Sequence, residues 1–260
     1  MGEIPDMSLD RRLLRDQGRV RVLAPAGPPT GIVLCLHGSR SNPDAQARLS
    51  GMARLAGVGA LVVFPRGSIR MGMGWGWDRE ADLPFLSDLV DELRARHPFA
   101  GRVCLAGMSG GARMACRLAA ARADAVGALG AVAGLRAPDR TPGRPVAVIA
   151  FHGASDRINP YAGGGRPEWQ ESVPDAARAW AVANGAGARA HEFTPSPRLT
   201  RVTYGAEEAP GEVTLWTMRG AGHTWPGGSM GLIARLRLGP TSREPDATGE
   251  IWAFFRRHAD

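Results

Sequence analysis

The sequence predicts an α/β fold in which a mostly parallel central sheet is covered by helices on both faces. Short apolar runs rich in Val, Ile and Leu alternate with longer segments of helical periodicity, and this alternation is typical of parallel sheets with crossover helices. No linker-like or low-complexity tract separates two apolar regions, and 260 residues suffice for one sizeable core. We therefore expect a single domain over residues 1–260.

Strands are expected where short runs are dominated by β-branched and other apolar residues. Helices are expected where apolar residues recur three or four positions apart, as Leu49, Met52 and Leu55 do, and as Met114 and Leu118 do. The strand ranges are 19–23, 31–37, 59–64, 102–106, 126–132, 146–151 and 212–218. The helix ranges are 44–56, 82–96, 111–122, 175–184 and 246–258.

Composition argues against several classes of partner. The net charge is +7, but all 32 basic residues are Arg, they are dispersed along the chain, and no nucleic-acid-binding motif accompanies them. The opening MGEIPDMSLDRRLL contains no signal-peptide pattern, and no apolar run reaches membrane-spanning length. We therefore expect a soluble, cytoplasmic protein that binds neither nucleic acid nor membrane, or a secreted one if a leader has been removed.

The three cysteines, Cys35, Cys104 and Cys116, show no C-x-x-C spacing, and each lies in an apolar run. This pattern is typical of buried free thiols rather than of a disulfide framework or a metal site.

The pattern G-x-S-x-G occurs twice, around Ser109 and around Ser229. Such a turn can expose a serine nucleophile when a strand enters it, a helix leaves it and glycines allow close packing. Ser109 meets these conditions, because RVCLA precedes it and ARMACRLAA follows it. Ser229 follows Trp-Pro-Gly-Gly, which favours a loop. Ser109 is therefore the predicted nucleophile.

A serine nucleophile needs a histidine base and a carboxylate that orients it, in the chain order Ser, Asp or Glu, His. Ligands bind at the carboxyl ends of parallel strands. Asp156 and His223 each follow a predicted strand by five residues, so both are expected at the edge that holds Ser109. His152 sits right at a strand end and is expected to be structural.

A competing triad of Ser229, Asp246 and His258 also has the required order. Asp246 is better explained as the N-cap of the last helix, and His258 as a solvated residue in its last turn. The oxyanion formed in acyl transfer needs two N–H donors, for which we expect Gly110 and Ser39, the latter in the HGS run after the second strand.

The motifs together resemble the α/β-hydrolase esterases of the polyhydroxybutyrate depolymerase and feruloyl esterase family. The runs that carry the resemblance are LHGS, FPRG, RVCLAGMSGGARMA, AFHGASDRINPYAGG, AWAVANG, GAGHTWPGG and ATGEIWAFFRRH. The resemblance extends from about residue 18 to the C-terminus and implies an α/β-hydrolase fold, with Ser109, Asp156 and His223 as catalytic triad and Ser39 and Gly110 as oxyanion donors.

The expected reaction is hydrolysis of a carboxylic ester through an acyl-enzyme, with no metal or organic cofactor. Candidate substrates are small aromatic esters of the feruloyl type, short-chain esters and hydroxyalkanoate oligomers, and the sequence leaves the choice and the oligomeric state open. We expect four side chains to line the substrate site: Trp225, Trp75, Trp77 and Tyr161. A peptidase, a thioesterase and a non-catalytic binding protein on the same fold remain the alternatives.

Overall fold

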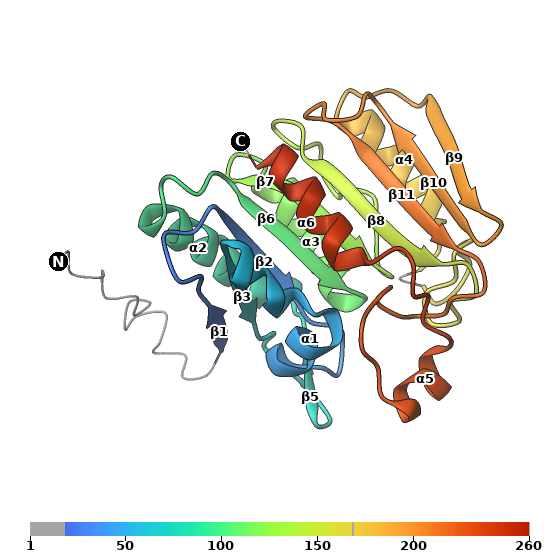
Figure 1. The fold of residues 1–260 in the computed structure, drawn as a ribbon, viewed down its shortest axis with the longest axis horizontal. Coiled ribbons are helices and arrows are strands. Elements are labelled where there is room, and N and C mark those ends of the chain that lie inside the picture. Colours follow the sequence, from blue (N-terminus) through green and yellow to red (C-terminus); the bar gives the residue numbers. More distant parts are fainter. Residues whose placement is uncertain (1–18, 168, 260) are drawn as a thin grey trace.

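The computed structural model describes residues 19–167 and 169–259, and its centre is a sheet of nine strands in the order β1-β3-β2-β6-β7-β8-β11-β10-β9 (Figure 1). The strands are β1 (Val20–Leu23), β2 (Gly31–Leu36), β3 (Ala60–Pro65), β6 (Val103–Met108), β7 (Val126–Val132), β8 (Ala147–Gly153), β9 (Ala190–Ser196), β10 (Leu199–Tyr204) and β11 (Val213–Met218). The six strands from β3 to β11 in this order run parallel, and antiparallel strands flank them on both sides.

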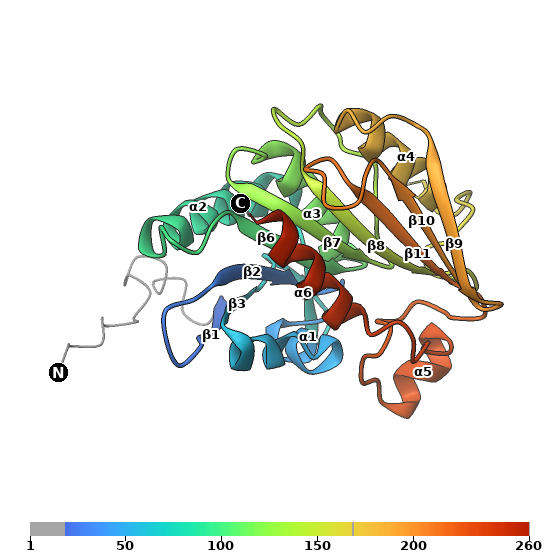
Figure 2. The same cartoon turned by 45° about the horizontal axis from the view of Figure 1, so that its top comes forward.

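Helices cover both faces of the sheet, as Figures 1 and 2 show. One face carries α2 (Arg79–Arg96), α3 (Gly110–Ala121) and α4 (Val173–Ala183). The other carries α1 (Pro43–Ser50), the 3₁₀ helix η1 (Met52–Val58) and α6 (Ala247–His258). A short helix, α5 (Leu232–Leu238), lies beyond one end of the sheet, and β4 (Ile69–Met71) and β5 (Gly74–Gly76) form a separate hairpin.

The apolar character of the parallel strands follows from this double coverage. In β2 every residue is buried: Ile32 and Leu34 face the core under α2 and α3, while Val33 and Cys35 face the core under α1 and α6. A strand packed on both faces needs apolar residues at successive positions. Cys35, Cys104 and Cys116 are free and buried, and burial raises the pKa of each thiol to about 12.

The mostly parallel sheet with helices on both faces is confirmed, and each of the seven predicted strands is present. The predicted helix 44–56 is wrong as one element, because Gly51 takes φ 66° and divides it into α1 and η1. The helix predicted from residue 82 begins at Arg79, because the Asp78 side chain accepts hydrogen bonds from the amides of Glu80 and Ala81.

Four segments were not predicted: the β4–β5 hairpin, β9, β10 and α5. Residues of β9 are mostly exposed, and neither it nor the hairpin has a buried apolar face long enough to give a periodic pattern. The N-terminal stretch in which we find no signal peptide lies outside the described residues. In the part of the chain that the structure covers, no helix combines the length and apolar character needed to cross a membrane.

His258 departs from its prediction as a solvated residue. Its side chain is buried, its Nε2 lies 3.1 Å from Glu212 Oε2, and its ring packs on Phe254. The Glu212 carboxylate also accepts hydrogen bonds from the Glu208 amide and the Thr214 hydroxyl. The prediction failed because α6 packs its last turn against the segment that leads into β11, a contact that helical position alone does not reveal.

The groups around Glu212 stabilise the charged form of its carboxyl group. Burial by itself raises the pKa of the Glu212 carboxyl, but the hydrogen bonds from His258, the Glu208 amide and Thr214 outweigh burial and hold the pKa below its ordinary value of 4.5. A folded-state pKa below the unfolded value means that the carboxylate stabilises the fold above pH 4.5, and that this contribution is lost as the pH falls through the folded-state pKa.

We therefore predict that Glu212→Gln lowers the free energy of unfolding by about 2 kcal/mol at pH 7, because a charged acceptor is lost from a buried cluster. The difference from the wild type should shrink as the pH falls below 4.5. Urea unfolding at pH 7, 5 and 4 measures both effects. Glu244→Gln, the same change at an exposed position, is the control; an equal effect of the two substitutions, or a Glu212 effect independent of pH, contradicts the prediction.

Candidate active site

Ser109 occupies a strained turn between β6 and α3. Its backbone has φ 54° and ψ −117°, a conformation that non-glycine residues rarely adopt. A Cβ on Gly107 would lie 2.7 Å from the Gly111 carbonyl carbon, and a Cβ on Gly111 would lie 2.3 Å from the Leu36 carbonyl oxygen. The flanking glycines therefore let α3 start in direct contact with the ends of β6 and β2, which is the close packing that a nucleophile elbow requires.

The second G-x-S-x-G match has a different environment. Ser229 lies exposed in the loop between β11 and α5, and its amide donates to the Leu49 carbonyl. Asp246 stands at the N-terminus of α6 as predicted, but its carboxylate pairs with Arg54 rather than capping the helix. His258 pairs with Glu212. Asp246 and His258 of the competing triad therefore each have another partner.

Asp156 and His223 form a buried pair. His223 Nδ1 lies 2.7 Å from Asp156 Oδ2, and each residue is 4% exposed. Asp156 Oδ1 accepts hydrogen bonds from the amides of Ile158 and Asn159, at 2.8 and 2.9 Å. These contacts fix the carboxylate in one orientation, so the Nδ1 proton of His223 is held and its Nε2 is left to act as an acceptor.

His152 is a second neighbour of the Asp156 carboxylate. Its Nε2 lies 3.3 Å from Asp156 Oδ2 and 2.8 Å from the Asn159 carbonyl oxygen. Burial by itself raises the pKa of the Asp156 carboxyl, but the hydrogen bonds of His152 and His223 outweigh burial and hold the pKa well below its usual range. Asp156 is therefore a carboxylate at neutral pH, and His152 occupies a supporting position behind it.

The three predicted triad residues lie at the same edge of the sheet. Ser109 follows β6 directly, Asp156 follows β8 by three residues, and His223 follows β11 by five. The Ser109 amide donates to the Val132 carbonyl at the end of β7, and the Ser155 amide donates to the Ala221 carbonyl, which joins the Asp156 loop to the His223 loop. The Ser109 hydroxyl makes no hydrogen bond to another residue within 19–167 and 169–259; such bonds are often long before substrate binds.

Gly110 and Ser39 face one another next to the elbow. A Cβ on Gly110 would lie 2.4 Å from Ser39 Oγ and 3.3 Å from the Ser39 amide nitrogen, so the two residues are in close contact. Within the described part of the chain neither amide has a hydrogen-bond partner. Two unpaired N–H groups beside a serine nucleophile can stabilise a developing oxyanion.

The β4–β5 hairpin supports the loop that carries Ser39. Trp75 exchanges backbone hydrogen bonds with this loop, accepting from the Arg40 amide and donating to the Ser41 carbonyl, both at 2.8 Å. The Trp77 indole Nε1 donates to the His37 carbonyl at 2.7 Å. These bonds fix residues 37–41 against a hairpin that the sequence did not reveal.

The His37 ring links the same loop to the end of β3. Its Nε2 accepts a hydrogen bond from the Gly67 amide at 3.1 Å, and its Nδ1 lies 2.8 Å from the Gly38 carbonyl oxygen. Burial lowers the pKa of His37 to about 4, so the ring is neutral near pH 7 and the Nδ1-protonated tautomer satisfies both contacts. Buried Asp82 accepts from the amides of Ser68 and Asp78 and holds the two ends of the hairpin together.

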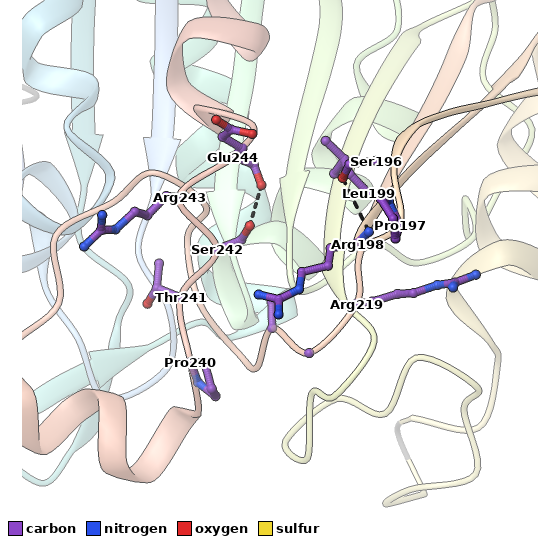
Figure 3. A pocket seen from close by; sticks show the side chains of 12 residues that line it. Ser196, Pro197, Arg198, Leu199, Arg219, Pro240, Thr241, Ser242, Arg243 and Glu244 are labelled. Atoms are coloured by element: carbon purple, nitrogen blue, oxygen red, sulfur yellow. Dashed lines mark hydrogen bonds between the residues drawn. The ribbon is translucent and has the colours of Figure 1, made fainter.

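One cavity near this edge of the sheet contacts both candidate oxyanion donors. This cavity, of about 370 Å³, is lined by Ser39, Gly110 and Trp77 together with charged residues of α3 and of the segment after β7. A larger cavity, of about 860 Å³, lies between the β9–β10 turn, the loop after β11 and residues 240–244 (Figure 3). Neither lining includes Ser109, Asp156 or His223, and of the two only the smaller cavity contacts Ser39 and Gly110.

Of the four side chains predicted to line the substrate site, only Trp77 lines this cavity. Trp75 packs against Arg66 and Arg70 in the hairpin. The Tyr161 hydroxyl lies 2.8 Å from Thr217 Oγ1, which directs Tyr161 to β11.

The prediction that Trp225 lines the substrate site is wrong. The side chain is fully buried in the core under α1 and α6, and its Nε1 donates to Thr248 Oγ1 at 3.0 Å. Proximity in sequence to His223 suggested a pocket, but the chain turns inward after the histidine.

Two residues that support the site, Asn159 and Asp82, were not predicted from the sequence. Asn159 is fully buried, and its Nδ2 donates to the Ala133 carbonyl, which joins the Asp156 loop to the end of β7. Asp82 lies in a predicted helix, where an acidic residue is ordinarily taken for a solvated one. The local spacing D-x-x-N could have suggested Asn159, because Asp and Asn side chains commonly organise turns.

We predict that Trp225→Phe lowers the free energy of unfolding by about 1–2 kcal/mol, because the indole hydrogen bond to Thr248 and some packing are lost. In a catalytically active preparation KM should stay near the wild-type value, since the side chain is buried in the core. Thermal or urea unfolding and steady-state kinetics measure the two effects. A raised KM at unchanged stability would restore Trp225 to the substrate site.

Comparison with known proteins gives a sequence relative and several structural ones, while no model of a protein family matches the chain. NocK of Nocardia uniformis subsp. tsuyamanensis, designated an esterase, is 29% identical over an alignment of 238 residues that covers 79% of this chain and 67% of NocK.

Three similar solved structures share the fold at low sequence identity. Acetyl xylan esterase from Aspergillus awamori aligns with a TM-score of 0.60 at 15% identity, covering 79% of this chain and 88% of that one. Esterase PE8 aligns at 0.58 and 18% identity, covering 92% and 97%. Bacillus cereus carboxylesterase aligns at 0.51 and 20% identity, covering 67% and 85%. Together with the parallel sheet and its covering helices, these similarities show that the chain has the α/β-hydrolase fold.

Proposed function

We propose that this protein is a serine carboxylic-ester hydrolase that acts through an acyl-enzyme. The observation that carries the proposal is the buried Asp156–His223 pair at the sheet edge that also holds the Ser109 elbow and two unpaired amides. The designation of NocK as an esterase and the esterase names of the three structural relatives support the same reaction class.

In the proposed mechanism His223 Nε2 accepts the Ser109 hydroxyl proton while Oγ attacks the ester carbonyl carbon. The carbonyl electron pair moves onto oxygen, which the Ser39 and Gly110 amides stabilise. When the tetrahedral intermediate collapses, the C–O bond to the alcohol breaks and the alcohol takes the proton from His223. Water then repeats both steps on the acyl-enzyme. Asp156 stays ionised throughout and stabilises the imidazolium.

We predict that a fluorophosphonate probe labels the native protein and that Ser109→Ala abolishes labelling, because the probe reacts only with an activated serine. Turnover of p-nitrophenyl acetate should fall by at least about 10³-fold in the same variant. Ser229→Ala, in the other G-x-S-x-G match, is the control and should label normally. Undiminished labelling of Ser109→Ala, or no labelling of the native protein, rejects the mechanism.

Three ester classes stay open as substrates: feruloyl-type aromatic esters, short-chain esters and hydroxyalkanoate oligomers. A panel of p-nitrophenyl esters of graded chain length, methyl ferulate and a hydroxybutyrate oligomer separates them by kcat/KM. A peptide and a thioester in the same panel test the peptidase and thioesterase alternatives. The proposed partner is in each case a small or oligomeric ester rather than a nucleic acid or a membrane.

Trp77 is proposed as a positioning residue for the Ser39 amide. We predict that Trp77→Phe lowers kcat by about tenfold with little change in KM, because a misplaced oxyanion donor weakens transition-state stabilisation more than substrate binding. The matched control is Trp75→Phe, in the same hairpin, which removes no side-chain hydrogen bond among the described residues. Equal losses in the two variants, or a loss confined to KM, argue against a positioning role.

A further inference from the structure

His152 is buried between the sheet and the segment that follows the Asp156 loop. It is the last residue but one of β8 and is 1% exposed. Its ring stacks on Trp169, with the ring centroids 5.9 Å apart and an interplanar angle of 29°, and it contacts the Tyr161 ring. Trp169 is itself anchored, because its indole Nε1 donates to the Pro160 carbonyl at 2.8 Å. These contacts fix the plane of the imidazole.

The hydrogen bonds of His152 select one tautomer. Its Nε2 faces two acceptors, the Asn159 carbonyl oxygen at 2.8 Å and Asp156 Oδ2 at 3.3 Å, so this nitrogen carries the proton. Its Nδ1 is buried and has no hydrogen-bond partner among the residues that the structure describes. A second proton on Nδ1 would be a buried donor without an acceptor, which is costly. His152 is therefore a neutral ring whose Nε2–H is shared between a backbone carbonyl and the carboxylate.

Asp156 Oδ2 is the atom at which two histidines meet. It accepts from His223 Nδ1 at 2.7 Å and from His152 Nε2, while Oδ1 accepts from the amides of Ile158 and Asn159. A carboxylate offers about four lone-pair sites, and these four N–H groups fill them. With His152 in place, the carboxylate cannot turn without losing a hydrogen bond.

The same N–H also closes the turn that carries the carboxylate. Asp156 Oδ1 accepts from the Asn159 amide at 2.9 Å, and the Asn159 carbonyl is the second acceptor of the His152 proton. Asn159 Nδ2 donates to the carbonyl of Ala133, the residue after β7, at 2.7 Å. Because β8 lies between β7 and β11 in the sheet, His152 holds both ends of the turn from a rigid strand, and side chains on strands are placed more precisely than side chains on loops.

His152 can act only through the carboxylate, since its Nε2 proton is committed and its Nδ1 is buried. We infer that His152 is a positioning residue for ester hydrolysis, and that its Nε2–H holds Asp156 Oδ2 on His223 Nδ1. The inference rests on the proposed esterase function and adds a residue to it. Without the His152 bond the carboxylate turns away from His223 for part of the time, and the base then loses its tautomer and orientation. Fewer molecules are ready to take the Ser109 proton, so turnover falls while ester binding is unchanged.

The first test separates turnover from binding. His152→Phe keeps a ring that can stack on Trp169 but removes the N–H, so kcat for p-nitrophenyl acetate should fall about tenfold while KM stays within about twofold of the wild-type value. His152→Gln places an amide N–H near the position of Nε2 and should recover most of kcat. The matched control is His258→Phe, because His258 is also buried and its Nε2 lies 3.1 Å from the Glu212 carboxylate; it should keep the wild-type kcat. Rates are expressed per site labelled by the fluorophosphonate probe, so partial unfolding does not enter.

A double-mutant cycle tests whether His152 acts through Asp156. Asp156→Asn alone should slow fluorophosphonate labelling by about 10²-fold or more, because the base loses its orienting carboxylate. Adding His152→Phe to that variant should slow labelling by less than about twofold further, since the group that His152 positions is already gone. If His152→Phe does not fold, His152→Asn takes its place throughout, because its shorter amide does not reach Oδ2.

The outcomes separate the inference from the function on which it rests. Four results each overturn the inference and leave the esterase function standing: a wild-type kcat in His152→Phe, an equal loss in His258→Phe, an equal loss in His152→Gln, and losses that multiply in the cycle. A lower kcat that His152→Gln recovers, and that disappears in the Asp156→Asn background, supports it. Absence of turnover and of labelling in the native protein rejects the esterase function itself.

Discussion

The contact on which the site depends most is the backbone approach of α3 to the end of β2 at Gly111. A Cβ at this position would lie 2.3 Å from the Leu36 carbonyl oxygen and 2.5 Å from that of His37. Only glycine permits this distance. Because α3 starts so close to β2, Ser109, Gly110 and the Ser39 loop meet at one place, and the nucleophile and both candidate oxyanion donors come from two adjacent strands.

The part of the site around Asp156 is held together by hydrogen bonds between buried polar groups rather than by close backbone packing. Asp156 receives backbone amides on one oxygen and histidine nitrogens on the other. Each hydrogen bond favours the charged form, so a carboxylate that burial would neutralise stays ionised. His152 therefore contributes to the electrostatics of the site although His223 is the candidate base. Asn159 connects this loop to β7 and so to the strand beside the elbow.

Support for the oxyanion loop comes from a part of the chain with little apolar sequence signal. The β4–β5 hairpin and Trp77, which follows it, hold residues 37–41 through backbone pairing and the indole hydrogen bond. Asp82 accepts hydrogen bonds from the amides of Ser68 and Asp78, one on each side of the hairpin. Arg113 and Arg117, which line the neighbouring cavity, lie on α3, the same helix that begins at the elbow. The N-terminus of α3 thus contributes to the candidate oxyanion site, and its following turns line the adjacent cavity.

The sequence by itself determined the parallel core and the order of the candidate triad. Buried strands must be apolar on both faces, which gives the runs over β2, β6 and β8, and the Ser109 elbow has a local steric requirement that glycine spacing reveals. Only the tertiary structure decided which side chains meet across the sheet. It buried Trp225 in the core, paired His258 with Glu212, and brought the β4–β5 hairpin to the Ser39 loop. These contacts join residues far apart in the chain, so their partners leave no periodic or local pattern in the sequence.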